Sequence, residues 1–115
     1  MNAVDEAVKL ADDIADIIKN SHIYKDYLVA LANIERDEET MEKIKAFKVK
    51  HLEFARERMN GVENYEKEKY ISQEYYKILL NEDAQTYFKN EEELISLISE
   101  VYSRLAEKCY LNLFI

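Results

Sequence analysis

The chain has 115 residues, of which 48% are hydrophobic and 35% charged, a balance typical of a single domain (1–115) and not of a disordered protein. One glycine and no proline leave tight turns and hairpins without their usual residues, which predicts an all-α fold, an elongated helical bundle. The net charge of −8 disfavours binding to nucleic acid and anionic lipid, and the sequence contains no long apolar run and no basic leader, so we expect no membrane association.

The first predicted helix spans residues 2–19 and is amphipathic. Its apolar residues recur every three or four positions, with acidic residues between them. This stripe consists of Val4, Ala7, Val8, Ala11, Ile14, Ala15 and Ile18. The pattern stops at Asn20 and Ser21, which compete for backbone hydrogen bonds inside a helix. We expect Ser21 to cap a second helix over residues 22–36.

Two further helices are predicted over residues 38–59 and 65–80. Asp37 and Asn64 precede them as N-cap residues. Gly61 suits the left-handed conformation that closes a helix, and it marks the one expected loop. Near Ser21 and Asp37 the sequence is compatible either with kinks or with true loops, and the same holds near Asn81, before the last helix.

The last predicted helix, 82–113, follows Asn81 as its cap and is about 45 Å long at 1.5 Å per residue. A bundle of so few residues cannot cover that length, so a partner is expected, and a homodimer is the simplest one. The apolar tail after residue 108 would dock in a dimer groove, or its Cys109 would bind a ligand shared with a partner chain. The predicted interface consists of Phe88, Leu94, Ile98, Val101, Tyr102, Leu105, Cys109, Leu111 and Phe114.

The stretch "SHIYKD" contains residue types of a catalytic site, with Ser21 as nucleophile, His22 as base and Asp26 as its orienting residue. Neighbours on a helix point about 100° apart, so Ser21 and His22 cannot face each other. The sequence also lacks a glycine-rich turn that would expose a nucleophile or build an oxyanion hole. Capping explains the serine better, and we predict no catalytic residue and no enzymatic activity.

A metal centre and a cofactor are not predicted either. A di-iron site in a helical bundle needs a glutamate three residues before each histidine, but Lys19 precedes His22 and Lys48 precedes His51. We expect His51 to be a packed core or interface residue. The lone cysteine cannot form an internal disulfide, which favours a reducing, cytoplasmic location.

Lysines and tyrosines of the third and fourth predicted helices offer an alternative function, direct binding of RNA. Bases could stack on these tyrosines while the lysines contact phosphates. Glu66, Glu68 and Glu74 weaken the positive field of this region. We therefore favour a protein–protein interface, in which tyrosine is also enriched.

The sequence resembles the YlbF/YmcA family of small bacterial helical regulators. The resemblance is carried by "LADDIADIIKNSHIYKDY" followed by "ALANIERDEE", then "KIKAFK", and "ISQEYYKILLNEDAQTYFKNEEELISLISEVYSRL" beyond the Gly61 loop. The positions that align with the family pattern are Ser21, Tyr24, Tyr27, Asp37, Glu39, Ile44, Phe47, Asn81, Phe88 and Glu92.

The resemblance implies a non-enzymatic, all-helical regulatory or adaptor protein in an intertwined homodimer. It also implies a role in competence, sporulation or biofilm control. Some members form heteromeric complexes with family paralogues that assist an endoribonuclease in RNA maturation and are associated with iron–sulfur clusters. This chain departs from a cluster-binding pattern, because Cys109 is its only cysteine.

Overall fold

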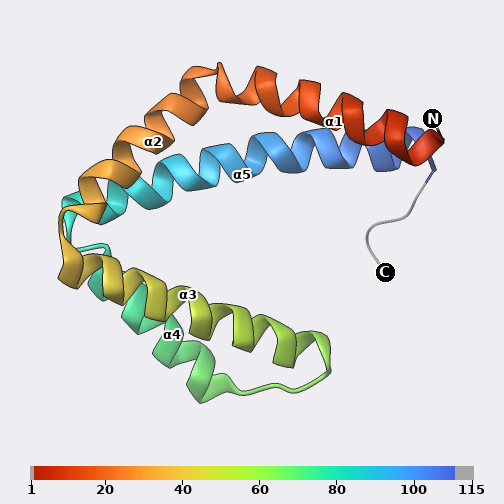
Figure 1. Ribbon diagram of the computed structural model, residues 1–115. Coiled ribbons are helices and arrows are strands. Elements are labelled where there is room, and N and C mark those ends of the chain that lie inside the picture. The colour runs from red at the N-terminus through yellow and green to blue at the C-terminus, as the bar shows by residue number, and fades with distance from the viewer. Residues whose placement is uncertain (1, 111–115) are drawn as a thin grey trace. The chain divides into compact units, whose positions relative to one another are not determined.

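The computed structural model describes residues 2–110, and within that range it contains five α-helices and no strand (Figure 1). The helices are α1 (Ala3–Lys19), α2 (His22–Glu35), α3 (Glu38–Met59), α4 (Tyr65–Ile78) and α5 (Glu82–Lys108). The prediction of an all-α fold is confirmed. The chain forms two compact units, a central unit (Ala30–Phe88) and a terminal unit made of the residues before and after it.

In the terminal unit, α1 begins and ends with side-chain caps. The Asn2 side chain accepts a hydrogen bond from the Asp5 N–H at 2.9 Å, and the Asn20 amide donates to the Asp16 carbonyl at 2.9 Å. No residue of α1 is buried, and Val4 is 69% exposed. The start of α1 and the end of α5 lie at the same end of this unit (Figure 1). The first part of the apolar stripe that predicted α1, up to Ala11, is therefore exposed, whereas Ile14, Ala15 and Ile18 are half-buried.

The central unit has a hydrophobic core, in which α3 packs against α4. Its buried residues are Ala30, Ile34, Ile44, Phe54, Ile71, Ile78, Ala84 and Tyr87. Phe47 stacks on Tyr75 with 5.3 Å between ring centroids, and it meets Phe88 edge to face at 6.1 Å. Such aromatic pairs add to the stabilisation from burial, so this cluster fixes how α3, α4 and the start of α5 pack.

Polar side chains hold the starts of α3 and α5 together. Asp37 caps α3 by accepting from the Thr40 N–H at 3.1 Å, and Asn81 caps α5 by accepting from the Ala84 N–H at 3.0 Å. The Asn81 amide also donates to Asp37 and to the Thr40 hydroxyl, each at 3.4 Å. Hydrogen bonds from Thr40 lower the pKa of Asp37 below its usual 3.8, because they stabilise the carboxylate.

The loop between α3 and α4 begins at Gly61, whose φ of +81° is the predicted left-handed conformation. The Val62 N–H donates to the Glu57 carbonyl at 2.9 Å and the Gly61 N–H to the Arg58 carbonyl at 3.0 Å. These two bonds form a Schellman motif, which satisfies carbonyls at the end of α3. Asn64 then caps α4 by accepting from the Lys67 N–H at 3.0 Å.

Several helix ends differ from the predicted bounds. Asn2 is the cap before α1, and Arg36 lies in the turn after α2. The fourth helix ends at Ile78, because the chain must turn before Asn81 can cap α5. The fifth ends at Lys108, and Tyr110 has a φ of +56°, which a continuing helix does not allow. Positions 111–113 of that prediction lie outside the described residues.

The breaks that the sequence left open as kinks or loops are short turns that separate helices. Residues 20–21 separate α1 from α2, residues 36–37 separate α2 from α3, and residues 79–81 separate α4 from α5. Each turn ends in a residue that caps the following helix. Asp37 and Asn81 do so as described above, and the Ser21 hydroxyl accepts a hydrogen bond from the Tyr24 N–H at 3.3 Å. The corners are thus set by local hydrogen bonds.

Candidate functional site

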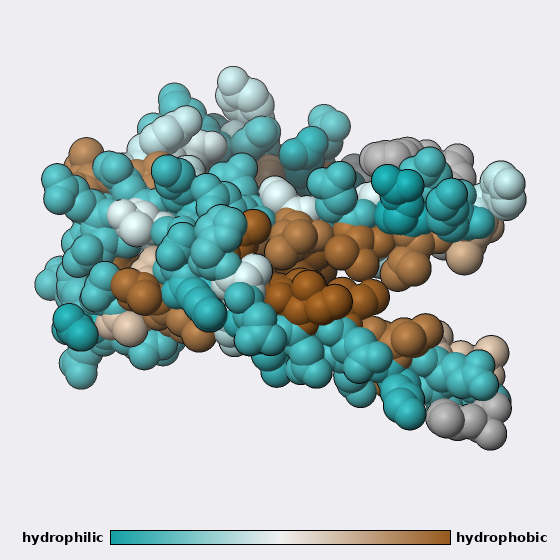
Figure 2. Space-filling model, turned by 90° about the horizontal axis from the view of Figure 1, so that it is seen from above, coloured by the Kyte–Doolittle hydropathy of each residue, from teal (hydrophilic) through white to brown (hydrophobic). Residues whose placement is uncertain are grey.

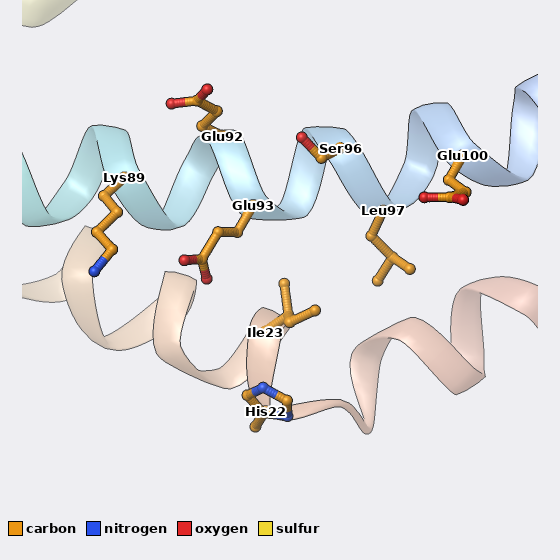
Figure 3. A pocket seen from close by; sticks show the side chains of 8 residues that line it. All are labelled: His22, Ile23, Lys89, Glu92, Glu93, Ser96, Leu97 and Glu100. Carbon is orange, nitrogen blue, oxygen red and sulfur yellow. The ribbon is translucent and has the colours of Figure 1, made fainter.

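An open hollow of about 590 Å³ lies in the terminal unit between the start of α2 and α5 (Figure 3). It is lined by His22, Ile23, Lys89, Glu92, Glu93, Ser96, Leu97 and Glu100. Ile23 and Leu97 point toward each other, Glu93 points toward α2, and Glu92 points away from it. The hollow combines a small apolar contact with charges of both signs.

Ser21, at the edge of this region, is occupied by helix capping. Its hydroxyl donates to the Ile18 carbonyl at 2.6 Å and accepts from the Tyr24 N–H. His22 and Asp26 are exposed. Among residues 2–110, no hydrogen bond joins the Ser21 hydroxyl to His22, so the three side chains are not assembled as a nucleophile with its base.

The described residues offer no metal site. In the part of the chain that the structure describes, no group of three or more His, Cys, Asp or Glu side chains could hold a metal ion. Cys109 is exposed. Of the two roles expected for His51, that of a packed core residue is wrong within this chain. His51 is exposed, and its ring stacks on Phe47 with 5.7 Å between the ring centroids.

The predicted interface residues fall into two groups. The described ones all lie on α5 or in the turn after it, but they belong to different units. The terminal unit holds Leu94, Ile98, Val101, Tyr102, Leu105 and Cys109, and the central unit holds Phe88, which is half-buried in the aromatic cluster. Ile98 is 51% and Leu105 56% exposed, while Leu94 and Val101 are half-buried. Leu111 and Phe114 lie outside the described residues.

The interface predicted from the sequence does not include several other exposed apolar residues of the terminal unit. Ile95, beside the α5 stripe, is 54% exposed, and Val4 and Val8 of α1 are uncovered. Figure 2 shows uncovered apolar side chains, in brown, on two diverging arms to the right of the view. The signal was present in the sequence, since the stripes on α1 and α5 together exceed what one small subunit can bury.

Lysines of α3 and α4, which suggested RNA binding, engage neighbours in their own chain. Ion pairs join Lys43 to Glu39, Lys45 to Glu42, Lys67 to Glu57 and Lys77 to Glu74, over 3.4, 3.9, 2.8 and 3.4 Å. Lys48 and Lys50 lie over the rings of Tyr87 and Tyr70, at 4.8 and 5.1 Å from the centroids. These contacts reduce the charge and ring surface that a nucleic acid could use.

No helix in the described part of the chain is long and apolar enough to cross a membrane.

Comparison with known proteins matches residues 7–109 to the family described as "Control of competence regulator ComK, YlbF/YmcA". Two relatives named "UPF0342 protein", from Caldicellulosiruptor saccharolyticus and Caldicellulosiruptor bescii, are each 30% identical to this chain over 99 residues. The alignments cover 85% of this chain and 82% and 83% of the relatives. No solved structure matches the chain. The protein therefore belongs to the YlbF/YmcA family, a family of regulators of competence.

Proposed function

We propose that this protein is a non-enzymatic cytoplasmic adaptor that forms a homodimer and regulates other proteins through its helical faces. The family description, control of a competence regulator, supports a regulatory role. The engagement of the Ser21 hydroxyl in a helix cap supports an activity based on binding and not on catalysis.

The uncovered apolar surface of the terminal unit is the observation that carries this proposal. Val4 on α1 is 69% exposed, and Ile98 and Leu105 on α5 are about half exposed. Leaving apolar surface in water costs roughly 25 cal/mol for each Å². Exposed apolar surface of this kind marks an interaction site on a soluble protein.

A second copy of the chain covers this surface most simply. A two-fold contact uses the same patch on both subunits, so no additional sequence is needed. The faces of the dimer that remain free, including the aromatic and charged side chains of α3 and α4, are then available to other proteins. By family resemblance, those partners are paralogues of the same family or an endoribonuclease-associated complex that acts in RNA maturation, competence, sporulation or biofilm control.

Coexpression with YlbF/YmcA paralogues from the same host tests the adaptor function. We expect a stable mixed complex by size-exclusion chromatography with light scattering. Ile98→Asp should abolish it, because the charge enters the apolar face of α5 and leaves no folded homodimer to present the faces of α3 and α4. Ser103→Asp is the matched control, since Ser103 is exposed on the opposite face of the same helix. The absence of a mixed complex with any paralogue would contradict the proposal.

Direct RNA binding is the competing function, and a salt titration separates it from the adaptor function. Phosphate contacts by lysine make affinity fall steeply as salt rises. The adaptor proposal predicts no RNA binding by the isolated protein at micromolar concentration. Tight, salt-sensitive binding that is lost when Lys43 and Lys45 are replaced by glutamine would establish RNA as the target instead.

A further inference from the structure

The apolar stripe of α5 is symmetric along its length. Its members follow one another at spacings of four, three and four residues, as in the a and d positions of a coiled coil. They are Leu94, Ile98, Val101 and Leu105. Glu91 lies three residues before the stripe and Lys108 three residues after it. Each position therefore has a counterpart at the same distance on the other side of the midpoint between Ser99 and Glu100.

The face that carries this stripe is partly open in the chain, since Leu94 and Val101 are half-buried and the other two members are exposed. Ile98, at its centre, is 51% exposed, and Leu105 is 56% exposed. Ile95 and Tyr102 lie beside Ile98 on the helix surface, at 100° per residue, and widen the apolar face. All of these residues belong to the terminal unit, so the availability of the face does not depend on the central unit.

We propose that α5 pairs with α5 of a second copy in antiparallel orientation, centred between Ser99 and Glu100. This inference rests on the homodimer of the proposed function and adds its orientation and register. Leu94 then packs against the partner's Leu105, and Ile98 against the partner's Val101. In an antiparallel coiled coil, each layer combines an a position of one helix with a d position of the other. The spacing of the stripe gives Leu94 and Val101 one of these positions, and Ile98 and Leu105 the other.

Charge at the two ends of the stripe selects the orientation. In the antiparallel register, Glu91 meets the partner's Lys108 at both ends of the helix pair. A parallel pair would set glutamate against glutamate and lysine against lysine, and like charges in contact are destabilising. Glu91 also interacts within its own chain, but its two carboxylate oxygens can accept further hydrogen bonds. Lys108 is exposed and can reach it.

The length of the pair agrees with a dimer that also uses α1. From Glu91 to Lys108 the helix extends about 26 Å at 1.5 Å per residue. One helix pair of this length supplies only part of the roughly 800 Å² that each partner buries in a stable interface. The exposed part of the α1 stripe, from Val4 to Ala11, lies in the same unit and is available for the remainder.

Disulfide trapping tests the register directly. Cys109 is the only cysteine, so Cys109→Ser provides a background without thiols. In this background, Leu94→Cys and Leu105→Cys are introduced separately and together. Only the double variant should form a disulfide-linked dimer on mild oxidation, because Leu94 lies next to the partner's Leu105. Each single cysteine would be about 16 Å from its own copy, too far for a disulfide.

Each outcome of the trapping experiment is decisive when sedimentation equilibrium is run on the same samples. Linked dimers from the double variant alone support the antiparallel register. Linked dimers from either single variant would show a parallel pair and overturn it. A dimer in the centrifuge without any linked species would overturn the register and leave the homodimer standing. A monomer in the centrifuge for the chain with only Cys109→Ser would overturn both.

Discussion

Replacing Asn81 with alanine removes two kinds of hydrogen bond from one position. The side-chain oxygen caps α5 at 3.0 Å from the Ala84 nitrogen, and loss of such a cap costs about 1 kcal/mol. The amide group also donates to Asp37 and Thr40 at 3.4 Å, near the long limit for a hydrogen bond. Together those two weak bonds add about 0.5–1 kcal/mol. We expect Asn81→Ala to lower the free energy of unfolding by about 1.5–2 kcal/mol.

Asn64 provides the matched control for this prediction. It caps α4 at 3.0 Å from the Lys67 nitrogen, and its side chain makes no second hydrogen bond among the described residues. Asn64→Ala should therefore cost about 1 kcal/mol. Urea unfolding followed by circular dichroism measures both values. All variants are compared at one protein concentration, because mass action stabilises a dimer. Equal costs for the two variants would refute the link between the starts of α3 and α5.

Four further predictions follow from single residues. Asp37→Asn should be less stable than wild type at neutral pH, because the lowered pKa of Asp37 means that its carboxylate stabilises the folded state. This difference in the free energy of unfolding should vanish as the pH falls through and below 3.8, and a difference that persists in acid would contradict the prediction. Gly61→Ala should cost about 1 kcal/mol in urea unfolding from backbone strain alone, since no atom lies within 4 Å of the added Cβ; a neutral substitution would refute the strain. Ile98→Asp should give unfolded or aggregated protein, whereas on a monomer this half-exposed position would tolerate the change within about 0.5 kcal/mol. Lys108→Glu should raise the dissociation constant of the dimer about tenfold in sedimentation experiments, because it sets like charges against Glu91 at both ends of the helix pair. An unchanged dissociation constant would contradict that contact.

Local patterns in the sequence predicted the helices well. Gly61 and Asn64 mark the single long turn, because a left-handed glycine and a capping side chain act on their immediate neighbours. Helix ends were less predictable where several residues compete for the same role. The last turn of α4 gives way to the turn that lets Asn81 cap α5, and that outcome depends on contacts with Asp37 across the central unit.

The surroundings of single side chains were harder to predict, since periodicity places a residue on a face but does not say what covers that face. His51 has the spacing of a core residue, yet it stacks on the outside of Phe47. Phe88, predicted at an interface, is half-buried among the rings of the central unit. Val4 and Val8 have the same spacing as core residues and are uncovered. In the homodimer proposed above, a second copy of the chain covers them, and the pattern of a single helix does not specify that contact.

Sedimentation equilibrium of the wild-type protein at micromolar concentration decides whether the chain forms the proposed homodimer. The uncovered apolar faces of α1 and α5 predict a mass of twice the 13.7 kDa of one chain across the concentration range. A mass near 13.7 kDa would contradict the homodimer and the antiparallel helix pair together.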